Sequence, residues 1–269
     1  MSDYVLGNDQ EELSRLKLQH YLWRTELIKL WDFSRIKFSK KILDLGCGPG
    51  FTSMDILKYN SENCDLTSID FSNDFLNYYR HHVQSLAPIN KISALQANIE
   101  LLDLEEKNFD TAFCRWLMIF VNHPKKAVEQ VQKHLKPGGE FIIQEYVSYD
   151  SMDLVPDSKT MKTVVEAIFK SWKDQGGDPN RGKYLPAILE NSGFRVKHLE
   201  PVAKFARPGD PLWYWPESFY NSFLPRLVRN NYLSAETSKE FFIEWEQAKT
   251  EKGSFFVAPT VINIIAEKV

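Results

Sequence analysis

The sequence predicts an α/β fold built on a mostly parallel sheet. Two observations predict it. Short apolar segments alternate with segments of helical periodicity from residue 41 to residue 199, and the first apolar segment ends in a glycine-rich turn that leads into a helical segment. Such alternation is typical of strands and helices that build a parallel sheet. The chain has 269 residues, enough for a substantial core in one large domain or two small ones.

Residues 1–40 precede the first predicted strand and carry a helical pattern. Apolar residues recur there at roughly helical spacing: Leu13, Leu16, Leu18, Tyr21, Leu22, Leu27, Ile28 and Leu30. This spacing predicts one or two helices that pack against the core.

Residues 41–59 predict a strand, a tight turn and a helix. The apolar run 41–45 contains Asp44, residues 46–50 read Gly-Cys-Gly-Pro-Gly, and helical spacing follows from Thr52. Glycines at such a turn adopt backbone angles that other residues avoid, and they let a ligand approach the main chain. The free N–H groups at the helix start suit a carboxylate or a phosphate.

The glycine spacing limits the classes of ligand that this turn could bind. The dinucleotide fingerprint is G-x-G-x-x-G, and Phe51 stands where its third glycine belongs; no Gly-Lys-Ser/Thr follows, which excludes a P-loop. Residues 44–50 instead resemble motif I of the class I S-adenosylmethionine (SAM) dependent methyltransferases. The resemblance implies SAM as cofactor and S-adenosylhomocysteine (SAH) as product, and it places four residues against the cofactor: Asp44, Gly46, Cys47 and Gly48.

The second predicted strand, 65–69, ends at Asp70, which is followed by Phe71 and Ser72. An acidic side chain at this strand end can accept hydrogen bonds from both ribose hydroxyls. Ser72 has the character of an N-cap for a helix that continues to Val83. The alternative for Asp70 is a helix cap. The family resemblance implies that Asp70 holds the ribose and that Phe71 lies beside the adenine.

The third and fourth predicted strands, 91–97 and 109–114, also end in polar residues. The resemblance implies that Asn98 and Ile99 contact the adenine; asparagine replaces the usual aspartate and offers a neutral acceptor. Arg115 follows the fourth strand, at the edge where ligands of open α/β sheets bind. It is expected to meet the methionine carboxylate, the alternative being a salt bridge.

A helix is predicted from His123-Pro124 to Leu135, because proline suits a first helical turn. The Lys-Pro-Gly-Gly sequence at 136–139 predicts a turn into a fifth strand, 140–144. Further segments follow the same criteria: helices 156–173 and 185–191, a strand 194–199, and a last strand formed by 254–256 and 260–266 with an interruption near Pro259.

Residues 207–250 crowd aromatic side chains into one segment: Trp213, Tyr214, Trp215, Phe219, Tyr220, Phe223, Tyr232, Phe241, Phe242 and Trp245. A helical subdomain that buries its own aromatics is the main expectation. In the methyltransferases, insertions near the last strands also form substrate lids, so some of these rings are candidates to cover an apolar substrate.

Taken together, these markers identify the chain as a member of the class I methyltransferases, small-molecule type, over residues 1–200. The resemblance implies a Rossmann-like three-layer sandwich with a seven-stranded sheet whose last strand is antiparallel. We expect one overall domain in four parts: an N-terminal helical lid segment 1–40, a SAM-binding core 41–206, a helical insert or cap 207–250, and a final strand 251–269. The insert lies outside the resemblance, and the last strand matches it loosely.

The N-terminal segment resembles a lead-in that folds over the cofactor in some methyltransferases. Tyr4 and Gln19 are the residues implied to contact SAM there, and an ordinary amphipathic helix is the alternative.

Methyl transfer requires chiefly that an acceptor be aligned with the activated methyl group while water is excluded. A base helps only when the acceptor atom is protonated. The candidate bases are His20, His123, Glu145 and Tyr146, of which Glu145 has the best position, at the end of the fifth strand. Gln144, Trp172 and Trp213 are the predicted substrate contacts.

Composition restricts the remaining function classes. The 33 Lys and Arg residues are balanced by 36 Asp and Glu residues, so the composition does not predict the basic stripe that is typical of nucleic-acid binding. The three cysteines lack metal or disulfide spacing, so no metal site is expected, and Cys47 is better explained as a small turn residue than as a nucleophile. The polar N-terminus lacks a signal peptide and no apolar run approaches a membrane span, which predicts a soluble, cytoplasmic protein.

The sequence therefore favours methyl transfer from SAM to a small, partly apolar molecule. Three alternatives stay open: a tRNA or protein methyltransferase, a non-catalytic SAM-binding partner subunit and, disfavoured by Phe51, a nicotinamide oxidoreductase.

Overall fold

The computed structural model describes residues 10–83 and 91–269, and its largest element is a seven-stranded sheet. The strand order is β3-β2-β1-β4-β5-β10-β7. The strands are β1 (Lys41–Leu45), β2 (Asp65–Asp70), β3 (Ile92–Gln96), β4 (Phe109–Arg115), β5 (Leu135–Ser148), β7 (Phe194–Val202) and β10 (Thr260–Lys268). Strand β10 runs antiparallel to both of its neighbours, whereas the pairs from β3 to β5 are parallel. The predicted seven-stranded sheet with an antiparallel last strand is confirmed.

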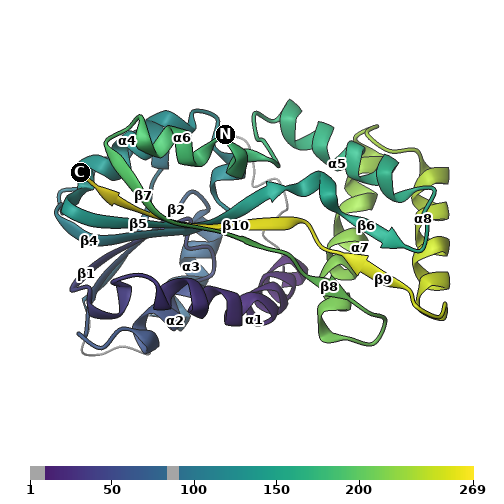
Figure 1. The fold of residues 1–269 in the computed structure, drawn as a ribbon, viewed down its shortest axis with the longest axis horizontal. Helices are drawn as coiled ribbons and strands as arrows, with labels where there is room; N and C mark the ends of the chain where they lie inside the picture. Colours follow the sequence, from purple (N-terminus) through teal and green to yellow (C-terminus); the bar gives the residue numbers. More distant parts are fainter. Residues whose placement is uncertain (1–9, 84–90) are drawn as a thin grey trace.

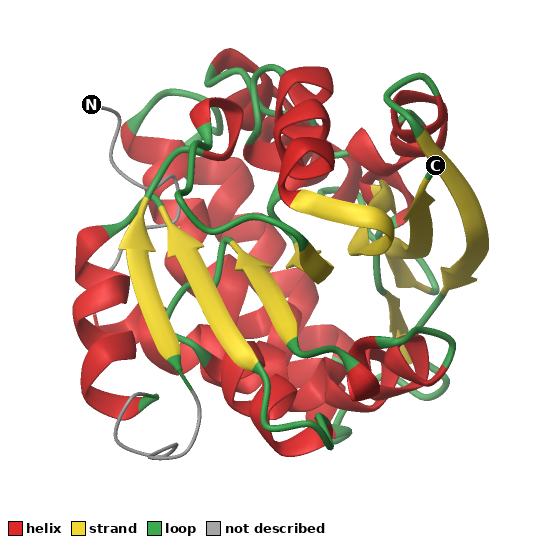
Figure 2. Cartoon of the chain, turned by 90° about the vertical axis from the view of Figure 1, so that its left-hand side faces the viewer, coloured by secondary structure: helices red, strands yellow, loops and turns green. Residues whose placement is uncertain are grey.

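Helices cover both faces of this sheet and give three layers (Figure 1). Helices α1 (Gln10–Asp32), α2 (Phe51–Tyr59) and α3 (Asn73–His82) lie on one face, and α4 (Pro124–His134) and α6 (Leu185–Glu190) on the other. Successive strand residues point to opposite faces. Ile42 belongs to the same core cluster as Trp31 of α1, whereas its neighbour Leu43 belongs to the core cluster that contains Val128 of α4. The end-on view of Figure 2 shows the twist of the sheet, which L-residues favour.

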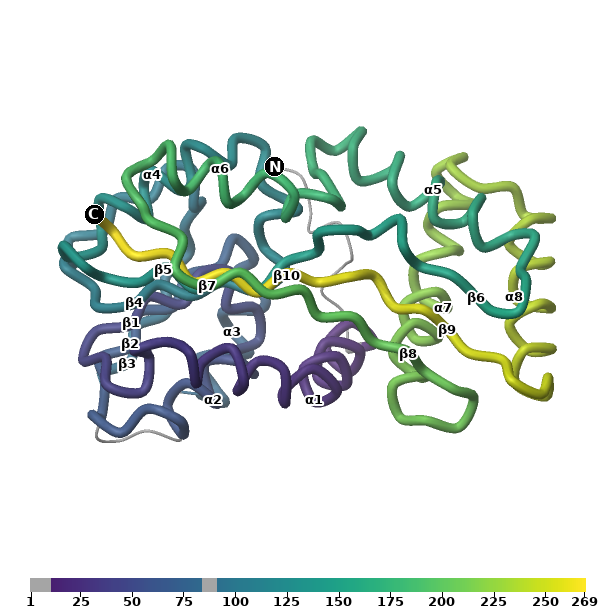
Figure 3. The backbone as a smooth tube through the Cα atoms, viewed as in Figure 1, coloured from purple at the N-terminus to yellow at the C-terminus, as the bar shows by residue number. Residues whose placement is uncertain are grey.

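A second, three-stranded sheet was not predicted. It contains β6 (Asp153–Val155), β9 (Phe255–Val257) and β8 (Phe205–Ala206), in that order. Figure 3 shows that β5, β10 and β7 of the large sheet continue across the molecule into β6, β9 and β8. The expectation that 254–256 belongs to the last strand of the large sheet is therefore wrong. Pro259, which has no N–H to donate to a ladder, lies at the break between β9 and β10.

The small sheet packs with three helices into an aromatic lobe, defined here as β6, β8, β9, α5 (Met161–Asp174), α7 (Tyr214–Arg229) and α8 (Ala235–Ala248). Tyr220, Phe241, Trp245 and Phe256 are buried together in it, with Tyr220 and Phe241 4.7 Å apart between ring centroids. The predicted aromatic-rich helical insert before the last strand is confirmed, and it buries most of its own rings.

Several local predictions agree with the structure and two need correction. The Ser72 hydroxyl accepts from Phe75 N at 3.3 Å and caps α3, as expected. The segment 136–139 is not a turn outside the sheet but an irregular start of β5, where Leu135 pairs with Phe109 and Glu140 with Thr111. Helix α5 begins at Met161 rather than at residue 156, because residues 158–160 instead hydrogen-bond to Glu244 of α8.

Candidate functional site

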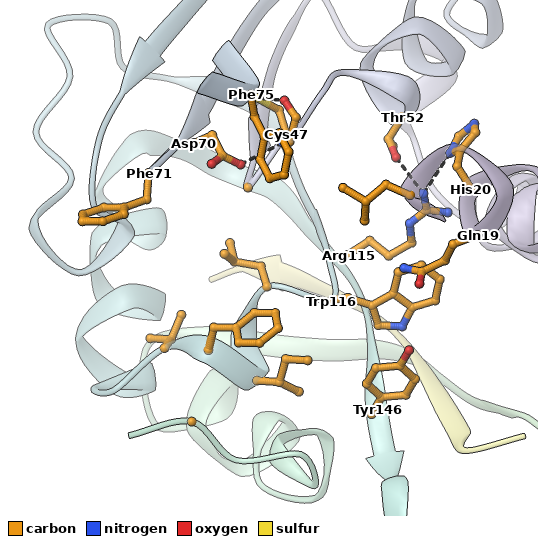
Figure 4. Close-up of a pocket in the computed structure, with 18 of the residues that line it drawn as sticks. Gln19, His20, Cys47, Thr52, Asp70, Phe71, Phe75, Arg115, Trp116 and Tyr146 are labelled. Carbon is orange, nitrogen blue, oxygen red and sulfur yellow. Dashed lines mark hydrogen bonds between the residues drawn. The ribbon is translucent and has the colours of Figure 1, made fainter. Parts of the chain in front are cut away.

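A cavity of about 460 Å³ lies between the carboxyl ends of the large sheet's strands and the aromatic lobe. Part of its lining is shown in Figure 4. The predicted site residues that line it are Gln19, Asp44, Gly46, Cys47, Gly48, Asp70, Phe71, Asn98, Ile99, Arg115 and Trp172. Gln144, Glu145 and Trp213 are outside its lining, and Tyr4 lies outside the described residues.

The glycine loop between β1 and α2 forms one wall, and its glycines have different reasons to be there. Gly46, Gly48 and Gly50 all have positive φ, at 66°, 53° and 91°. A Cβ on Gly46 would stand 2.9 Å from Leu117 Cδ1, and one on Gly50 would stand 2.5 Å from Val83 Cγ2. A Cβ on Gly48 would meet no atom within 4 Å. Gly48 therefore leaves open space beside the main chain, which is what close approach of a ligand requires.

Cys47 is buried in this loop, and burial raises the pKa of its thiol well above the ordinary value. A protonated, buried thiol is a poor nucleophile. Cys47 therefore acts as a small apolar residue of the turn.

Asp70 joins the end of β2 to the glycine loop. Its Oδ2 accepts from Gly48 N at 2.8 Å and its Oδ1 from Ser72 N at 2.8 Å. Each carboxylate oxygen can accept a further hydrogen bond, so the side chain is held in place and still able to bind hydroxyls. Phe71 stands half exposed at the cavity rim.

Asn98 caps a short helical turn, and its Oδ1 accepts a hydrogen bond from Glu100 N at 2.8 Å. The NH₂ group of the Asn98 side chain therefore retains two donors for a ligand.

Arg115, at the end of β4, is held by α1 and α2. Its Nη2 donates to His20 Nδ1 at 2.8 Å and to Thr52 Oγ1 at 3.0 Å (Figure 4). His20 Nε2 in turn donates to Asp55 Oδ2 at 3.1 Å. Accepting at one nitrogen and donating at the other requires a neutral imidazole, in agreement with burial, which lowers the pKa of His20.

The second terminal nitrogen of Arg115, Nη1, is buried and makes no hydrogen bond within residues 10–83 and 91–269. Burial lowers the pKa of Arg115 to about 10, so the group still carries its charge at neutral pH. A buried donor without a partner costs about 1 to 3 kcal/mol, and more for a charged group. Because Arg115 lines the cavity, an anionic group of a ligand is the fitting partner.

The other half of the cavity is bounded by six rings, which we call the aromatic belt: Trp215, Trp116, Tyr146, Tyr149, Trp172 and Phe219. Consecutive rings in this order lie 6.5, 5.7, 5.1, 5.0 and 6.5 Å apart between centroids. Trp116 joins the belt to the cofactor side, since the Arg115 guanidinium lies 4.8 Å from its ring centroid. Its φ is 51°, a strained value for a residue with a Cβ and one typical of functional sites.

Helix α1 closes the belt through polar contacts. Gln19 Oε1 accepts from Trp215 Nε1 at 2.9 Å and from Arg15 Nη1 at 2.8 Å. The guanidinium of Arg15 lies 5.9 Å from the Phe219 ring centroid and also donates two 2.7 Å hydrogen bonds to Glu12. The side-chain oxygen of Gln19 therefore links α1 to α7 and is already hydrogen-bonded within the protein.

The four candidate bases differ in their position relative to the cavity. His20 and Tyr146 line the cavity, while His123 is exposed at the start of α4. Glu145 is buried behind the cavity wall, accepting from Tyr146 N at 2.9 Å and Ile119 N at 3.2 Å, and burial raises its pKa to about 8. It supports the backbone that carries the belt and does not face the cavity.

The remaining two predicted substrate contacts also have other surroundings. Gln144 donates to Asn263 Oδ1 at 2.9 Å within the sheet. Trp213 is buried in the lobe, 4.5 Å from Trp245 between ring centroids.

Sequence reasoning did not assign Arg15, Trp116, Tyr149 or Trp215 individually to a site. Trp116 follows Arg115 at a strand end and was accessible to the same argument. The others reach the cavity only through packing between distant elements, for which no local signal exists.

Metal-binding clusters and membrane-spanning helices are both absent from residues 10–83 and 91–269. No group of three or more His, Cys, Asp or Glu side chains could hold a metal ion, and no helix combines the length and apolarity that crossing a membrane requires.

A family model described as a methyltransferase domain matches residues 36–193, more than half of the chain. Sterol 24-C-methyltransferase ERG6A of Gibberella zeae is 26% identical over 184 residues, 67% of this chain and 45% of that protein. The C-methyltransferase UbiE of ubiquinone and menaquinone biosynthesis in Bartonella henselae is 24% identical over 194 residues, 71% of this chain and 67% of that protein. The chain thus spans less than half the length of the fungal relative.

Among solved structures, protein BH2331 of Bacillus halodurans C-125 superposes with a TM-score of 0.62 at 18% identity. The superposition covers 91% of this chain and 99% of that one. It shows a shared fold.

Proposed function

Because the chain belongs to the methyltransferase domain family, we propose that it transfers a methyl group from SAM to a small, partly apolar acceptor. The observation that carries this proposal is the buried, unpartnered Nη1 of Arg115. It lies in the same cavity as the glycine loop and Asp70, on the side where β4 ends. The carboxylate of SAM's methionine moiety is the anion that such a group requires.

The residues around the cavity fit the parts of SAM. Arg115 would hold the carboxylate, Asp70 the ribose hydroxyls, and Asn98 with Phe71 the adenine. The open space at Gly48 admits a ligand against the main chain. When bound, SAM supplies a methyl group activated by a sulfonium.

The chain's own contribution is orientation and exclusion of water. The belt and α1 enclose the acceptor half of the cavity, and alignment in such an enclosure can supply much of a methyl transfer's rate. Of the candidate bases, His20 is neutral but hydrogen-bonded at both nitrogens. Tyr146 is a buried phenol whose pKa is raised well above its ordinary value. Neither is poised to remove a proton at neutral pH, which favours an acceptor that needs no strong base.

The experiment is calorimetric titration of the wild-type protein and Arg115→Lys with SAM, SAH and 5′-methylthioadenosine. The last ligand keeps the adenosine but lacks the amino-acid part. Lysine keeps the charge and loses the planar fork. We expect SAM and SAH to bind the variant at least tenfold more weakly, in line with about 1.5 to 3 kcal/mol for a hydrogen bond to a charged group. Methylthioadenosine should bind both proteins equally.

Other outcomes of these titrations would contradict the role of Arg115 or the proposed function. Equal weakening of methylthioadenosine would remove Arg115 from the carboxylate role. Tight NAD binding in a parallel titration, or no binding of SAM or SAH, would reject the methyltransferase proposal. SAM binding without turnover on any acceptor, together with a stable protein partner, would favour a non-catalytic subunit, and methylation of tRNA or protein would identify the macromolecular alternative.

A further inference from the structure

The acceptor half of the cavity is a closed ring of side chains. The six rings of the aromatic belt form most of it, and Gln19 and Arg15 of α1 complete the circuit from Trp215 back to Phe219. All eight side chains line the cavity. They come from α1, the segment after β4, β5 with the turn that follows it, α5 and α7. A molecule inside this ring therefore meets aromatic surface on most sides.

Two unpartnered donors belong to the ring. The indole Nε1 atoms of Trp116 and Trp172 are both buried and make no hydrogen bond to the described chain. The Trp172 side chain as a whole is only 3% exposed. Three indoles outside the cavity, those of Trp23, Trp31 and Trp213, are also buried without a partner in the described chain, so the missing partner alone does not indicate a ligand. Trp116 and Trp172 differ in that they line the cavity, where a ligand with an acceptor can satisfy their donors.

Charge on this side of the cavity argues against a cationic acceptor. The carboxylates that line the cavity, among the described residues, are Asp44, Asp70 and Glu100, which follow or belong to β1, β2 and β3. None belongs to the ring. The charged member of the ring is Arg15, whose charge is offset by Glu12. An ammonium group would find aromatic faces there but also a guanidinium and two indole N–H donors.

Size limits the acceptor further. Ligand cavities commonly measure about 300 to 1,000 Å³. At about 460 Å³ this cavity has to hold the cofactor as well, so the ring has room for a compact molecule.

We infer that the acceptor is a compact, planar aromatic molecule that carries a hydrogen-bond-accepting oxygen, with its ring inside the aromatic belt and its oxygen bound by Trp116 and Trp172. This inference rests on the proposed function and specifies its substrate class. The belt supplies flat apolar surface for the ring, and the two indoles supply the donors for a carbonyl, phenol or carboxylate oxygen.

The test uses the SAH-saturated protein and three probes of one shape. They are 2-acetylnaphthalene, which carries a carbonyl oxygen; naphthalene, which carries none; and 2-naphthylmethylamine, which is a cation at neutral pH. We expect 2-acetylnaphthalene to bind at least threefold more tightly than naphthalene and the amine to bind most weakly.

Three Trp→Phe variants separate recognition from packing. Trp116→Phe and Trp172→Phe keep a ring and remove the N–H; each should weaken 2-acetylnaphthalene by about three- to tenfold, the effect of one net hydrogen bond, and leave naphthalene within twofold. Trp31→Phe is the matched control. Its indole is also buried and unpartnered, but it packs between α1 and the large sheet outside the cavity, so its loss should not affect any probe.

Several results would overturn the inference. They are equal binding of 2-acetylnaphthalene and naphthalene, preference for the amine, no binding of any probe, or unchanged carbonyl-probe affinity in both belt variants. SAH affinity, measured in the same samples, reports folding and the cofactor site. If the wild-type protein does not bind SAH, the proposed function itself is rejected. If it binds SAH but does not prefer 2-acetylnaphthalene over naphthalene, only the inferred acceptor class is rejected. If a belt variant fails to fold, the wild-type probe series still decides.

Discussion

At the scale of single residues, Glu145 shows how a buried carboxyl group can support a site without touching it. Its carboxyl group is fully buried on β5 and accepts from the backbone of Ile119 and Tyr146. These two residues line the cavity. Glu145 therefore fixes the backbone behind the belt, and desolvation dominates its titration, raising its pKa from 4.5 to about 8.

The raised pKa predicts a pH dependence of stability. The folded protein binds more protons than the unfolded chain between pH 4.5 and about 8, so the Glu145 contribution to the free energy of unfolding falls as the pH rises through this window. Glu145→Gln cannot ionise. We expect its stability relative to wild type to improve by at least about 1.4 kcal/mol, a tenfold change in equilibrium constant, between pH 5.5 and pH 8.5.

Urea denaturation of both proteins at the two pH values measures this difference. Other groups with raised pKa values, such as Asp44 at about 6, titrate in both proteins and cancel in the comparison. A difference that stays constant with pH would show that Glu145 does not ionise in this range.

At the scale of elements, the glycine loop is fixed by its fit to α3. Gly50 has a φ of 91° and precedes α2, and the place of its missing Cβ is taken by Val83 and Tyr79 at 2.5 and 2.6 Å. Tyr79 is fully buried and hydrogen-bonds Ser68 of β2 at 2.8 Å, so it has little freedom to move. The loop is thus clamped between the first two strand–helix units.

Gly50→Ala should therefore be more harmful than an alanine at an open glycine. We expect a loss of about 2 to 4 kcal/mol, from left-handed backbone strain together with overpacking against Val83 and Tyr79. Gly209→Ala is the matched control: its φ is 90°, yet nothing lies within 4 Å of the added Cβ, so about 1 to 2 kcal/mol from backbone strain is the whole effect. Equal losses in urea denaturation would contradict the clamp.

At the scale of the whole molecule, the sheet and the aromatic lobe share three continuous stretches of chain. Strands β5, β7 and β10 run into β6, β8 and β9 (Figure 3), and Ala258 N donates to Lys204 O at 3.0 Å between the two sheets. The cavity lies at this junction and takes its lining from both parts. We therefore expect the two parts to unfold together.

Trp245→Ala tests this coupling. Trp245 is buried among Tyr220, Phe241 and Phe256, so its truncation should cost about 3 to 5 kcal/mol. Ile243→Ala, on the same helix but 48% exposed, should cost under about 0.5 kcal/mol. Native-state hydrogen exchange should show the Trp245→Ala loss in β10 as well as in α8. Loss confined to α8 would show that the lobe opens independently.

The sequence by itself determined the elements whose cause is local. Helical spacing, the glycine turn at residues 46–50 and the N-cap at Ser72 act within a few residues of the chain. The number of strands and the antiparallel last strand were implied by the family resemblance, whereas polar residues at successive strand ends indicate one edge of a parallel sheet. For the same reason most of the predicted cofactor residues reach one cavity.

The tertiary structure alone decided the acceptor side of the site. Aromatic residues read in sequence cannot show that Phe219 faces the cavity while Trp213 packs inside the lobe, since both lie in one aromatic segment. Nor can the pattern at residues 254–256 show that this strand pairs with β6 and β8. Such outcomes depend on contacts between residues far apart in the chain, and only the folded packing selects among the many pairings that the same pattern allows.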